Sequence, residues 1–266
     1  MSHGPFRADQ LRPGDSYELS NGHPIHCLPT GGRGARASSV GSSVLASDPA
    51  VESVGFDAGF SPSPDVLRAP DISVGNIPNE PGWVHGVPML AIEYADTGQD
   101  EQDLATKLQE LLDAGTRYIW VVRLTGPRRV EVHQAGKKMS LAHPGEELRA
   151  PGALANPVPV EALYDGEVGR EVILRNLLQR KGFDSLEAVE AEGEARGRVE
   201  GEAQGRVEGE AQGLRDAVVA VLTARGFAVG DDLRTALSGA QDPVFLRSIV
   251  QRAAVAASAE EILTAL

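Results

Sequence analysis

Two acidic residues and one lysine have the types and spacing that hydrolysis of a phosphate ester requires. Asp71 follows a proline at the start of a short strand-like segment, and Glu93 interrupts the apolar run 88–95 (PMLAIEYA). Mg²⁺ needs only one or two protein carboxylates, because it keeps several of its waters. A cation held in this way neutralises charge on a phosphate oxygen and makes a bound water nucleophilic. The pattern therefore predicts Asp71 and Glu93 as ligands of Mg²⁺ (or Mn²⁺).

Lys107 is the third member of this group. It lies three residues after Leu104 and four before Leu111, so it shares the helix face that would pack on a sheet. A lysine beside two sheet carboxylates can stabilise developing negative charge or orient the attacking water. The alternative is an ordinary surface pair with Asp103, one helical turn away.

The two carboxylates also have structural interpretations. A buried, unpaired carboxylate is costly, so Glu93 needs a cation or a hydrogen-bond donor, and a structural Arg or Lys partner would satisfy it equally well. Asp71 after a proline is also typical of a turn or of a strand entry. Glu93 is the sharper signal of the two because apolar residues flank it on both sides.

The elements that must position these residues form an α/β pattern. Helical spacing of leucines predicts a helix over 99–114, with acidic residues in its first turn and Gly115 placed to end it. An Asn-Gly pair between apolar segments predicts a hairpin near the start of the chain. The expected strands are 17–19, 24–28, 54–57, 71–74, 88–95, 118–124 and 130–133. This order indicates a mixed sheet flanked by helices, whereas the small-residue run 31–41 indicates a mobile loop or a weak helix.

The second half of the chain has a different character. A helix is expected over 164–180, and a long helical segment over 184–225 contains three octads, GEARGRVE, GEAQGRVE and GEAQGLRD. Glycine at every fourth position from 193 to 213 weakens this helix by about 1 kcal/mol per residue relative to alanine, which favours a flexible helical spacer. Two short capped helices follow, at Asp242-Pro243 and at Ser258 with Glu261.

We therefore predict three parts. Residues 1–165 form the domain that carries Asp71, Glu93 and Lys107. Residues 166–213 form a helical linker with the octad repeat, and residues 214–266 form a small helical module suited to self-association.

Charge and composition constrain the function. The formal net charge of −13 opposes non-specific DNA binding, which depends on Lys and Arg, so a nuclease of this composition needs a local basic patch, divalent cations or a partner. The single cysteine, Cys27, cannot form an internal disulfide, which is typical of a reducing cytoplasm. No stretch approaches the length of a membrane span, so we expect no membrane association and a cytoplasmic location.

At these residues the chain resembles the Uma-two family of restriction-endonuclease-like proteins, within the PD-(D/E)xK superfamily. The matching pieces are Pro70-Asp71, Ile92-Glu93, Asp103 with Lys107, Gly115 through Trp120-Val121-Val122, and the opening YELSNG, over roughly residues 15–165. The resemblance implies a sheet core flanked by helices, with Asp71 and Glu93 as metal ligands and Glu18 near the site. Ala95 stands where the superfamily's E-x-K places its lysine, so the resemblance implies that Lys107 is a catalytic lysine moved from strand to helix.

Two functional hypotheses follow. The first is a Mg²⁺-dependent endonuclease that hydrolyses DNA phosphodiester bonds and assembles as a homo-oligomer through its C-terminal helices. The second is a catalytically inactive protein of nuclease fold that oligomerises or binds a partner through its helical tail. The combination of Asp71, Glu93 and inward-facing Lys107 favours the enzyme, whereas the net acidity and the missing strand lysine favour the interaction protein. Hydrolysis of a different phosphate ester is a third, weaker possibility.

Overall fold

The computed structural model describes residues 4–266, so the first three residues of the predicted first domain lie outside it. The chain divides into two compact units, an N-terminal unit that ends at Ser185 and a C-terminal unit from Leu186 to Leu266. Helix α3 (Gly166–Arg180), which the sequence assigns to the linker, packs against α1 (Gly32–Ser47) and η2 (Val160–Leu163) within the N-terminal unit. The boundary between the units therefore lies after Ser185 rather than at residue 165.

The core of the N-terminal unit is a six-stranded mixed sheet. Its order is β11-β10-β9-β8-β6-β3, and only β8 and β9 run parallel; the other neighbours are antiparallel. A helix, α2 (Glu101–Asp113), connects the parallel pair, as a crossover between parallel strands requires. The strands are β3 (Val54–Phe56), β6 (Ile72–Val74), β8 (Leu90–Ala95), β9 (Tyr118–Arg123), β10 (Arg129–Gln134) and β11 (Ser140–Ala142).

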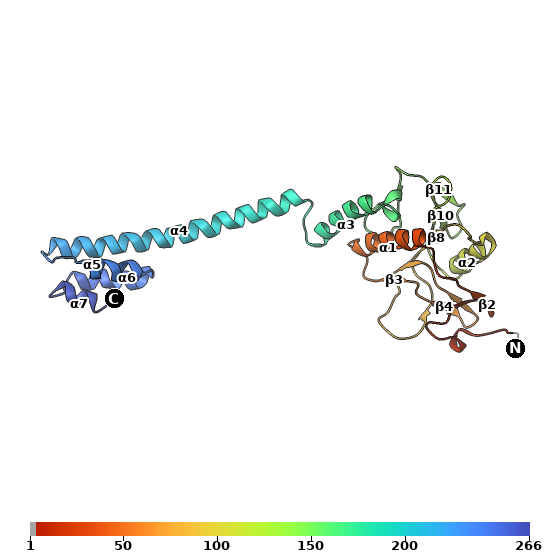
Figure 1. Cartoon of the computed structure of the whole chain (residues 1–266), viewed down its shortest axis with the longest axis horizontal. Helices are drawn as coiled ribbons and strands as arrows, with labels where there is room; N and C mark the ends of the chain where they lie inside the picture. The colour runs from red at the N-terminus through yellow and green to blue at the C-terminus, as the bar shows by residue number, and fades with distance from the viewer. Residues whose placement is uncertain (1–3) are drawn as a thin grey trace. The chain divides into compact units, whose positions relative to one another are not determined.

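Helices cover both faces of this sheet, with α1 and α3 on one side and α2 on the other (Figure 1). Because side chains alternate along a strand, Ile92 and Tyr94 of β8 face α1, whereas Ala91 and Ala95 face α2. On the α2 side the packing partners are the leucines that the sequence placed inward, Leu104, Leu108 and Leu111. The predicted fold class, a mixed sheet flanked by helices with a helical C-terminal extension, is confirmed.

The run 31–41 is not a mobile loop, because α1 is a 16-residue helix packed into the core. Its small residues allow close approach to the sheet: a Cβ added at Gly41 would lie 2.0 Å from the Tyr94 hydroxyl oxygen. That hydroxyl donates a hydrogen bond of 2.8 Å to the carbonyl oxygen of Leu163. Small residues that look loop-like in sequence therefore serve helix–sheet packing here.

A second sheet has the order β2-β1-β5-β4-β7 and supplies two residues of the candidate site, Glu18 from β1 and Arg68 from β5. Its hairpin turns at Asn21 and Gly22, both with positive φ, as the Asn-Gly pair predicts. The strands are β1 (Tyr17–Ser20), β2 (His23–His26), β4 (Phe60–Ser63), β5 (Val66–Arg68) and β7 (Val84–His85). Minor elements are η1 (Ala8–Gln10) and the pair β12 (Glu147–Leu148) and β13 (Val158–Pro159).

The C-terminal unit consists of the 39-residue helix α4 (Leu186–Ala224) and three short helices. The end of α4 packs against them through Val218 and Leu222, whereas the space around the repeat glycines 193–213 is open. The short helices are α5 (Asp231–Gly239), α6 (Pro243–Ala253) and α7 (Ala259–Leu263), of which the sequence predicted the last two and missed α5. Among residues 4–266, no helix is both long and apolar enough to cross a membrane.

Candidate active site

The register of the sheet places Asp71 and Glu93 side by side. Strands β6 and β8 are antiparallel, with Ile72 opposite Ile92 and Ser73 opposite Ala91. One residue beyond these pairs, the same register sets Asp71 opposite Glu93, and directly opposed side chains have Cβ atoms about 5 Å apart. The backbone N–H of Tyr94 donates a hydrogen bond of 2.6 Å to Asp71 Oδ2, which fixes that carboxylate against β8.

Both carboxylates lie on the sheet face that α2 covers. Ile72 and Ile92 point to the α1 side, so their neighbours Asp71 and Glu93 point to the α2 side. Glu93 is buried, with 9% of its side chain exposed. The sequence pattern had identified the burial of this carboxylate correctly.

Lys107 reaches the carboxylates from α2 instead of pointing to solvent. Its Nζ lies 2.9 Å from Glu93 Oε1 and 3.1 Å from Glu18 Oε1, and it donates a hydrogen bond of 2.7 Å to the Ala69 carbonyl oxygen. Only 12% of the lysine side chain is exposed. The alternative surface pair with Asp103 is absent from the ion pairs of residues 4–266, where Asp103 instead lies 3.7 Å from Arg68.

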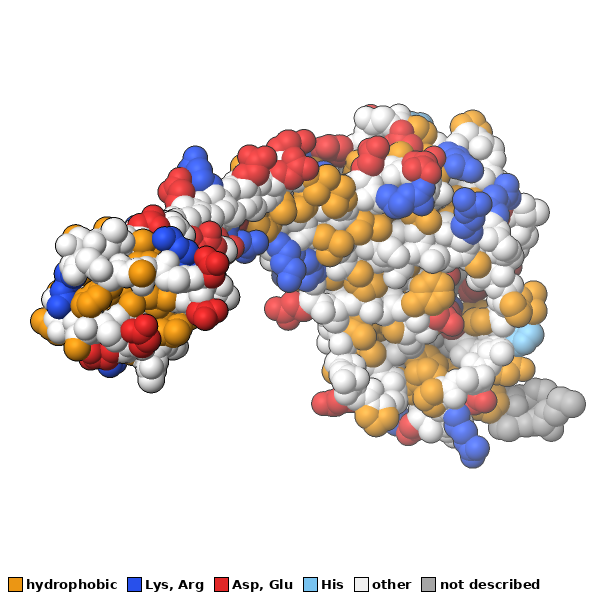
Figure 2. Space-filling model, turned by 60° about the vertical axis from the view of Figure 1, so that its left-hand side comes forward, with side chains coloured by type: hydrophobic (Ala, Val, Ile, Leu, Met, Phe, Trp, Pro, Cys, Tyr) orange, Lys and Arg blue, Asp and Glu red, His pale blue; other side chains and the backbone are white. Residues whose placement is uncertain are grey.

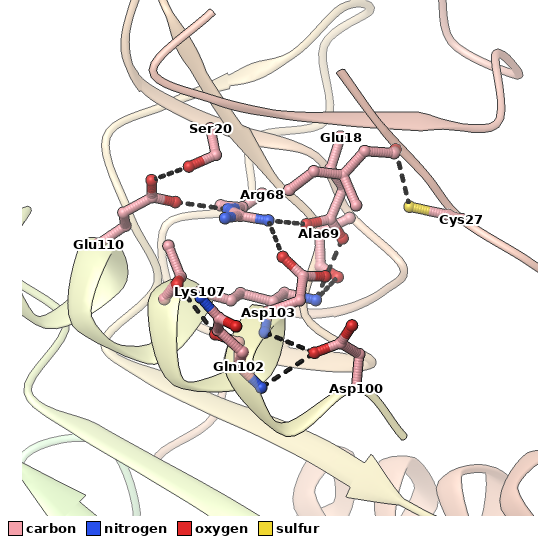
Figure 3. A network of polar contacts seen from close by, with 12 residues as sticks. Glu18, Ser20, Cys27, Arg68, Ala69, Asp100, Gln102, Asp103, Lys107 and Glu110 are labelled. Atoms are coloured by element: carbon pink, nitrogen blue, oxygen red, sulfur yellow. Dashed lines mark hydrogen bonds and ion pairs between the residues drawn. The ribbon is translucent and has the colours of Figure 1, made fainter. Parts of the chain in front are cut away.

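Glu18 joins the site from the second sheet. Leu19 of β1 pairs with Leu67 of β5, and the same register sets Glu18 opposite Arg68. One carboxylate oxygen of Glu18 contacts Lys107, and the other accepts a hydrogen bond of 3.1 Å from Arg68 Nη1. Glu18 therefore bridges the two cations of the site (Figure 3).

Arg68 is a site residue that the sequence analysis missed. Its side chain is fully buried, and its Nε donates a hydrogen bond of 2.6 Å to Glu110 Oε2 on α2. Ser20 donates to the other oxygen of Glu110 at 2.5 Å, so the arginine and the hairpin together hold α2 over the sheet (Figure 3). In the sequence, the one sign of this role is the position of Arg68 at the end of the short segment Val66–Arg68, three residues before Asp71.

The pKa values reflect the burial of this cluster. Burial raises the pKa of Glu93 to about 8, and the nearby carboxylates of Asp71 and Glu18 reinforce the shift while Lys107 opposes it. Burial also raises the pKa of Asp71, against the lowering effects of Lys107 and the Tyr94 N–H. For Lys107 burial alone would lower the pKa, but Glu93, Glu18 and Asp71 together raise it. The lysine therefore stays charged at neutral pH, whereas Glu93 tends to hold a proton when no other cation is near.

The carboxylate oxygens of Asp71 and Glu93 are suitable ligands for a hard divalent cation. Glu93 Oε1 is buried and has no well-aligned hydrogen bond, although it lies in ion-pair contact with Lys107. Among residues 4–266, the hydrogen bonds of the Asp71 side chain involve one of its two oxygens, Oδ2. Two carboxylates on neighbouring strands are enough for Mg²⁺, which takes its remaining ligands from water and substrate. These carboxylates do not form a complete coordination shell by themselves. Residues 4–266 contain no group of three or more His, Cys, Asp or Glu side chains arranged to hold a metal ion.

A helix-covered mixed sheet with paired carboxylates and an inward lysine defines a protein of restriction-endonuclease-like architecture. The family model of Uma2, described as "Putative restriction endonuclease", matches residues 6–158, and the chain belongs to this family. The resemblance inferred from the sequence is thereby confirmed.

Among solved structures, the chain is similar to a protein from Anabaena variabilis ATCC 29413, described as "a putative nuclease belonging to DUF820". The two are 19% identical, with a TM-score of 0.52, and the match covers 61% of this chain and 99% of that one. At this identity the likeness shows the fold. No curated protein matches the chain.

Proposed function

We propose that the N-terminal unit is a metal-dependent endonuclease that hydrolyses DNA phosphodiester bonds. The observation that carries the proposal is the register that sets Asp71, immediately before β6, opposite Glu93 of β8, with the inward-pointing Lys107 in contact with Glu93. Paired carboxylates with a nearby ammonium group provide a cation site and a donor for a phosphate in one small volume. Membership of a family described as "Putative restriction endonuclease" supports DNA as the substrate.

In this proposal Asp71 and Glu93 hold Mg²⁺ (or Mn²⁺). A bound divalent cation supplies charge neutralisation at a phosphate oxygen and a water of lowered pKa. Lys107 presents a permanently charged ammonium group to the negative charge that develops on the phosphate. Glu18 and the Ala69 carbonyl fix the position of Lys107, and Arg68 fixes Glu18 in turn.

The test is divalent-cation-dependent cleavage of plasmid and single-stranded DNA. Glu93→Gln keeps the shape of the side chain but removes its charge, so we expect loss of cleavage by at least a hundredfold, on the order of the effect of removing a transition-state contact. Glu80→Gln changes an exposed glutamate and is the matched control. Equal cleavage by the wild type and Glu93→Gln would refute the assignment, because the activity would then come from another site or another protein.

A second candidate function is an interaction protein that retains the fold without catalysis. The burial of the site favours it, because Glu93 and Lys107 are almost inaccessible and already contact each other. It predicts no cleavage with any divalent cation, together with self-association or partner binding through the C-terminal unit. Assembly as a homo-oligomer through these helices and a cytoplasmic location both remain predictions.

A further inference from the structure

An arginine-lined cavity of about 480 Å³ lies on the other side of the six-stranded sheet from Lys107. Three arginines contribute to its wall: Arg33 and Arg36 from the first turns of α1, and Arg128 from the turn between β9 and β10. The chain as a whole has a net charge of −13, so this concentration of cations is unusual for the molecule. Figure 2 shows Lys and Arg side chains gathered on the upper part of the N-terminal unit.

The three arginines differ in what they contact. Arg33 is fixed by a bidentate ion pair with Asp96 and by a hydrogen bond of 3.2 Å to Thr97 Oγ1. The guanidinium of Arg128 lies over the ring of Tyr164, 4.5 Å from its centroid, and this contact orders the arginine. Within residues 4–266, neither Arg36 nor Arg128 forms an ion pair with a carboxylate.

The one carboxylate in the cavity wall is already engaged. Asp165 is the N-cap of α3 and accepts a hydrogen bond of 2.9 Å from the Glu167 backbone N–H. This hydrogen bond leaves the negative charge of Asp165 in place. Beside that one carboxylate the cavity presents two guanidinium groups, Arg36 and Arg128, that form no ion pair within residues 4–266, so a positive charge remains in excess. Guanidinium groups bind phosphate oxygens through paired N–H donors, so phosphate is the ligand chemistry that this arrangement fits.

The cavity lies at the same end of the parallel strands as the candidate active site. Asp96, which holds Arg33, is three residues beyond Glu93, a distance of roughly 10 Å along an extended chain. Leu124 in the cavity wall directly follows β9, the parallel neighbour of β8. About three nucleotide steps of one DNA strand, at 3.4 Å each along the axis, span the same length.

We propose that this cavity binds a backbone phosphate of the nucleic acid near the position where it is cleaved. The proposal deepens the proposed nuclease function and depends on it for the identity of the ligand. It also supplies the local basic patch that an acidic chain needs to bind DNA. Arg36 and Arg128 donate to the phosphate, while Arg33, held by Asp96, lines the cavity beside them.

The test measures binding of a fluorescent DNA duplex by anisotropy, at several salt concentrations and with EDTA present so that no cleavage occurs. Arg36→Gln with Arg128→Gln should weaken binding by about tenfold or more and reduce the slope of log affinity against log salt by about one. The matched control is Arg12→Gln with Arg117→Gln, which removes the same total charge from two exposed arginines that form no ion pair within the described residues. The control should change affinity much less.

Two outcomes overturn the proposal. The first is unchanged DNA binding by the cavity variant, even where calorimetry shows that this variant has lost binding of inorganic phosphate. The second is equal weakening of DNA binding by both double variants. Cleavage assays with Mg²⁺ separate this proposal from the nuclease function. A wild type that binds DNA through the cavity but never cleaves it supports the binding site and refutes the enzyme. A wild type that cleaves normally while the cavity variant binds normally refutes the binding site alone.

Discussion

Replacing Lys107 by methionine tests whether the lysine is the cation that makes burial of Glu93 and Glu18 tolerable. Methionine keeps the length and the apolar stem of the side chain but removes the ammonium group. The variant loses two ion pairs, of 2.9 and 3.1 Å, and leaves the Ala69 carbonyl oxygen without its donor. Removal of one partner from a buried ion pair costs about 3–5 kcal/mol when the other charge remains.

The cost should depend on pH, because Glu93 can take up a proton. Burial already raises its pKa to about 8, and loss of the lysine removes an interaction that lowers it. A carboxyl whose pKa is higher in the folded state than in the unfolded state destabilises the fold as pH rises through that interval. We therefore expect a loss of about 3–5 kcal/mol at pH 9, above the wild-type pKa of Glu93, because the variant must there hold either a proton on Glu93 or an uncompensated buried charge. At pH 5 a neutral Glu93 should reduce the loss to about 1–2 kcal/mol, on the order of the lost hydrogen bond.

Urea unfolding followed by tryptophan fluorescence measures this difference. Both tryptophans, Trp83 and Trp120, lie in the N-terminal unit, so the signal reports on that unit alone. Lys138→Met, at an exposed position in the turn after β10, is the matched control. A loss that is the same at pH 5 and pH 9, or equal in the two variants, would refute the reasoning that Lys107 compensates buried carboxylates.

Four further predictions concern the metal, the packing of α1, the stability of α4 and assembly through the C-terminal unit. A divalent cation must displace the proton of Glu93, so the affinity for Mn²⁺, measured by titration calorimetry, should rise with pH up to about 8 and level off above it. An affinity independent of pH would exclude Glu93 as a ligand. Gly41→Ala should destabilise the N-terminal unit by about 1–3 kcal/mol in urea unfolding, because the new Cβ would lie 2.0 Å from the Tyr94 hydroxyl oxygen. Gly193→Ala, where a Cβ meets open space, should stabilise α4 by about 1 kcal/mol, measured by circular dichroism. Light scattering should show a monomer for a chain truncated after Ser185 and an oligomer for the full chain. The same number of chains per particle in both proteins would exclude the C-terminal unit as the means of assembly.

The sequence predicted the central strands and α2 well because local patterns determine them. The apolar run of β8 and the leucine spacing of α2 each report a buried face directly. The inward direction of Lys107 follows from the same helical spacing, which is why its position could be inferred without a structure. The pairing of Asp71 with Glu93 could not, since it depends on the register between β6 and β8, which no single segment encodes.

Other features were hidden for different physical reasons. Helix α1 has few large apolar residues, so its periodicity is weak, and its close packing depends on the absence of side chains at positions such as Gly41. Helix α5 begins after Gly230 without a side-chain cap, unlike the Asp and Ser caps of α6 and α7 that the sequence revealed. Strands β4, β5 and β7 are two to four residues long, which is too short for alternation to identify them.

The charge balance beneath α2 connects the missed arginine to the proposed chemistry. Five carboxylates gather there around two cations, Lys107 and Arg68, so full ionisation would leave three uncompensated negative charges. The carboxylates are Glu18, Asp71, Glu93, Asp103 and Glu110. A protein can reduce such an excess by retaining a proton, as the raised pKa of Glu93 indicates, or by binding a cation. Arg68 compensates the outer carboxylates of α2 and thereby leaves the excess at Asp71 and Glu93, where a divalent cation would relieve it most.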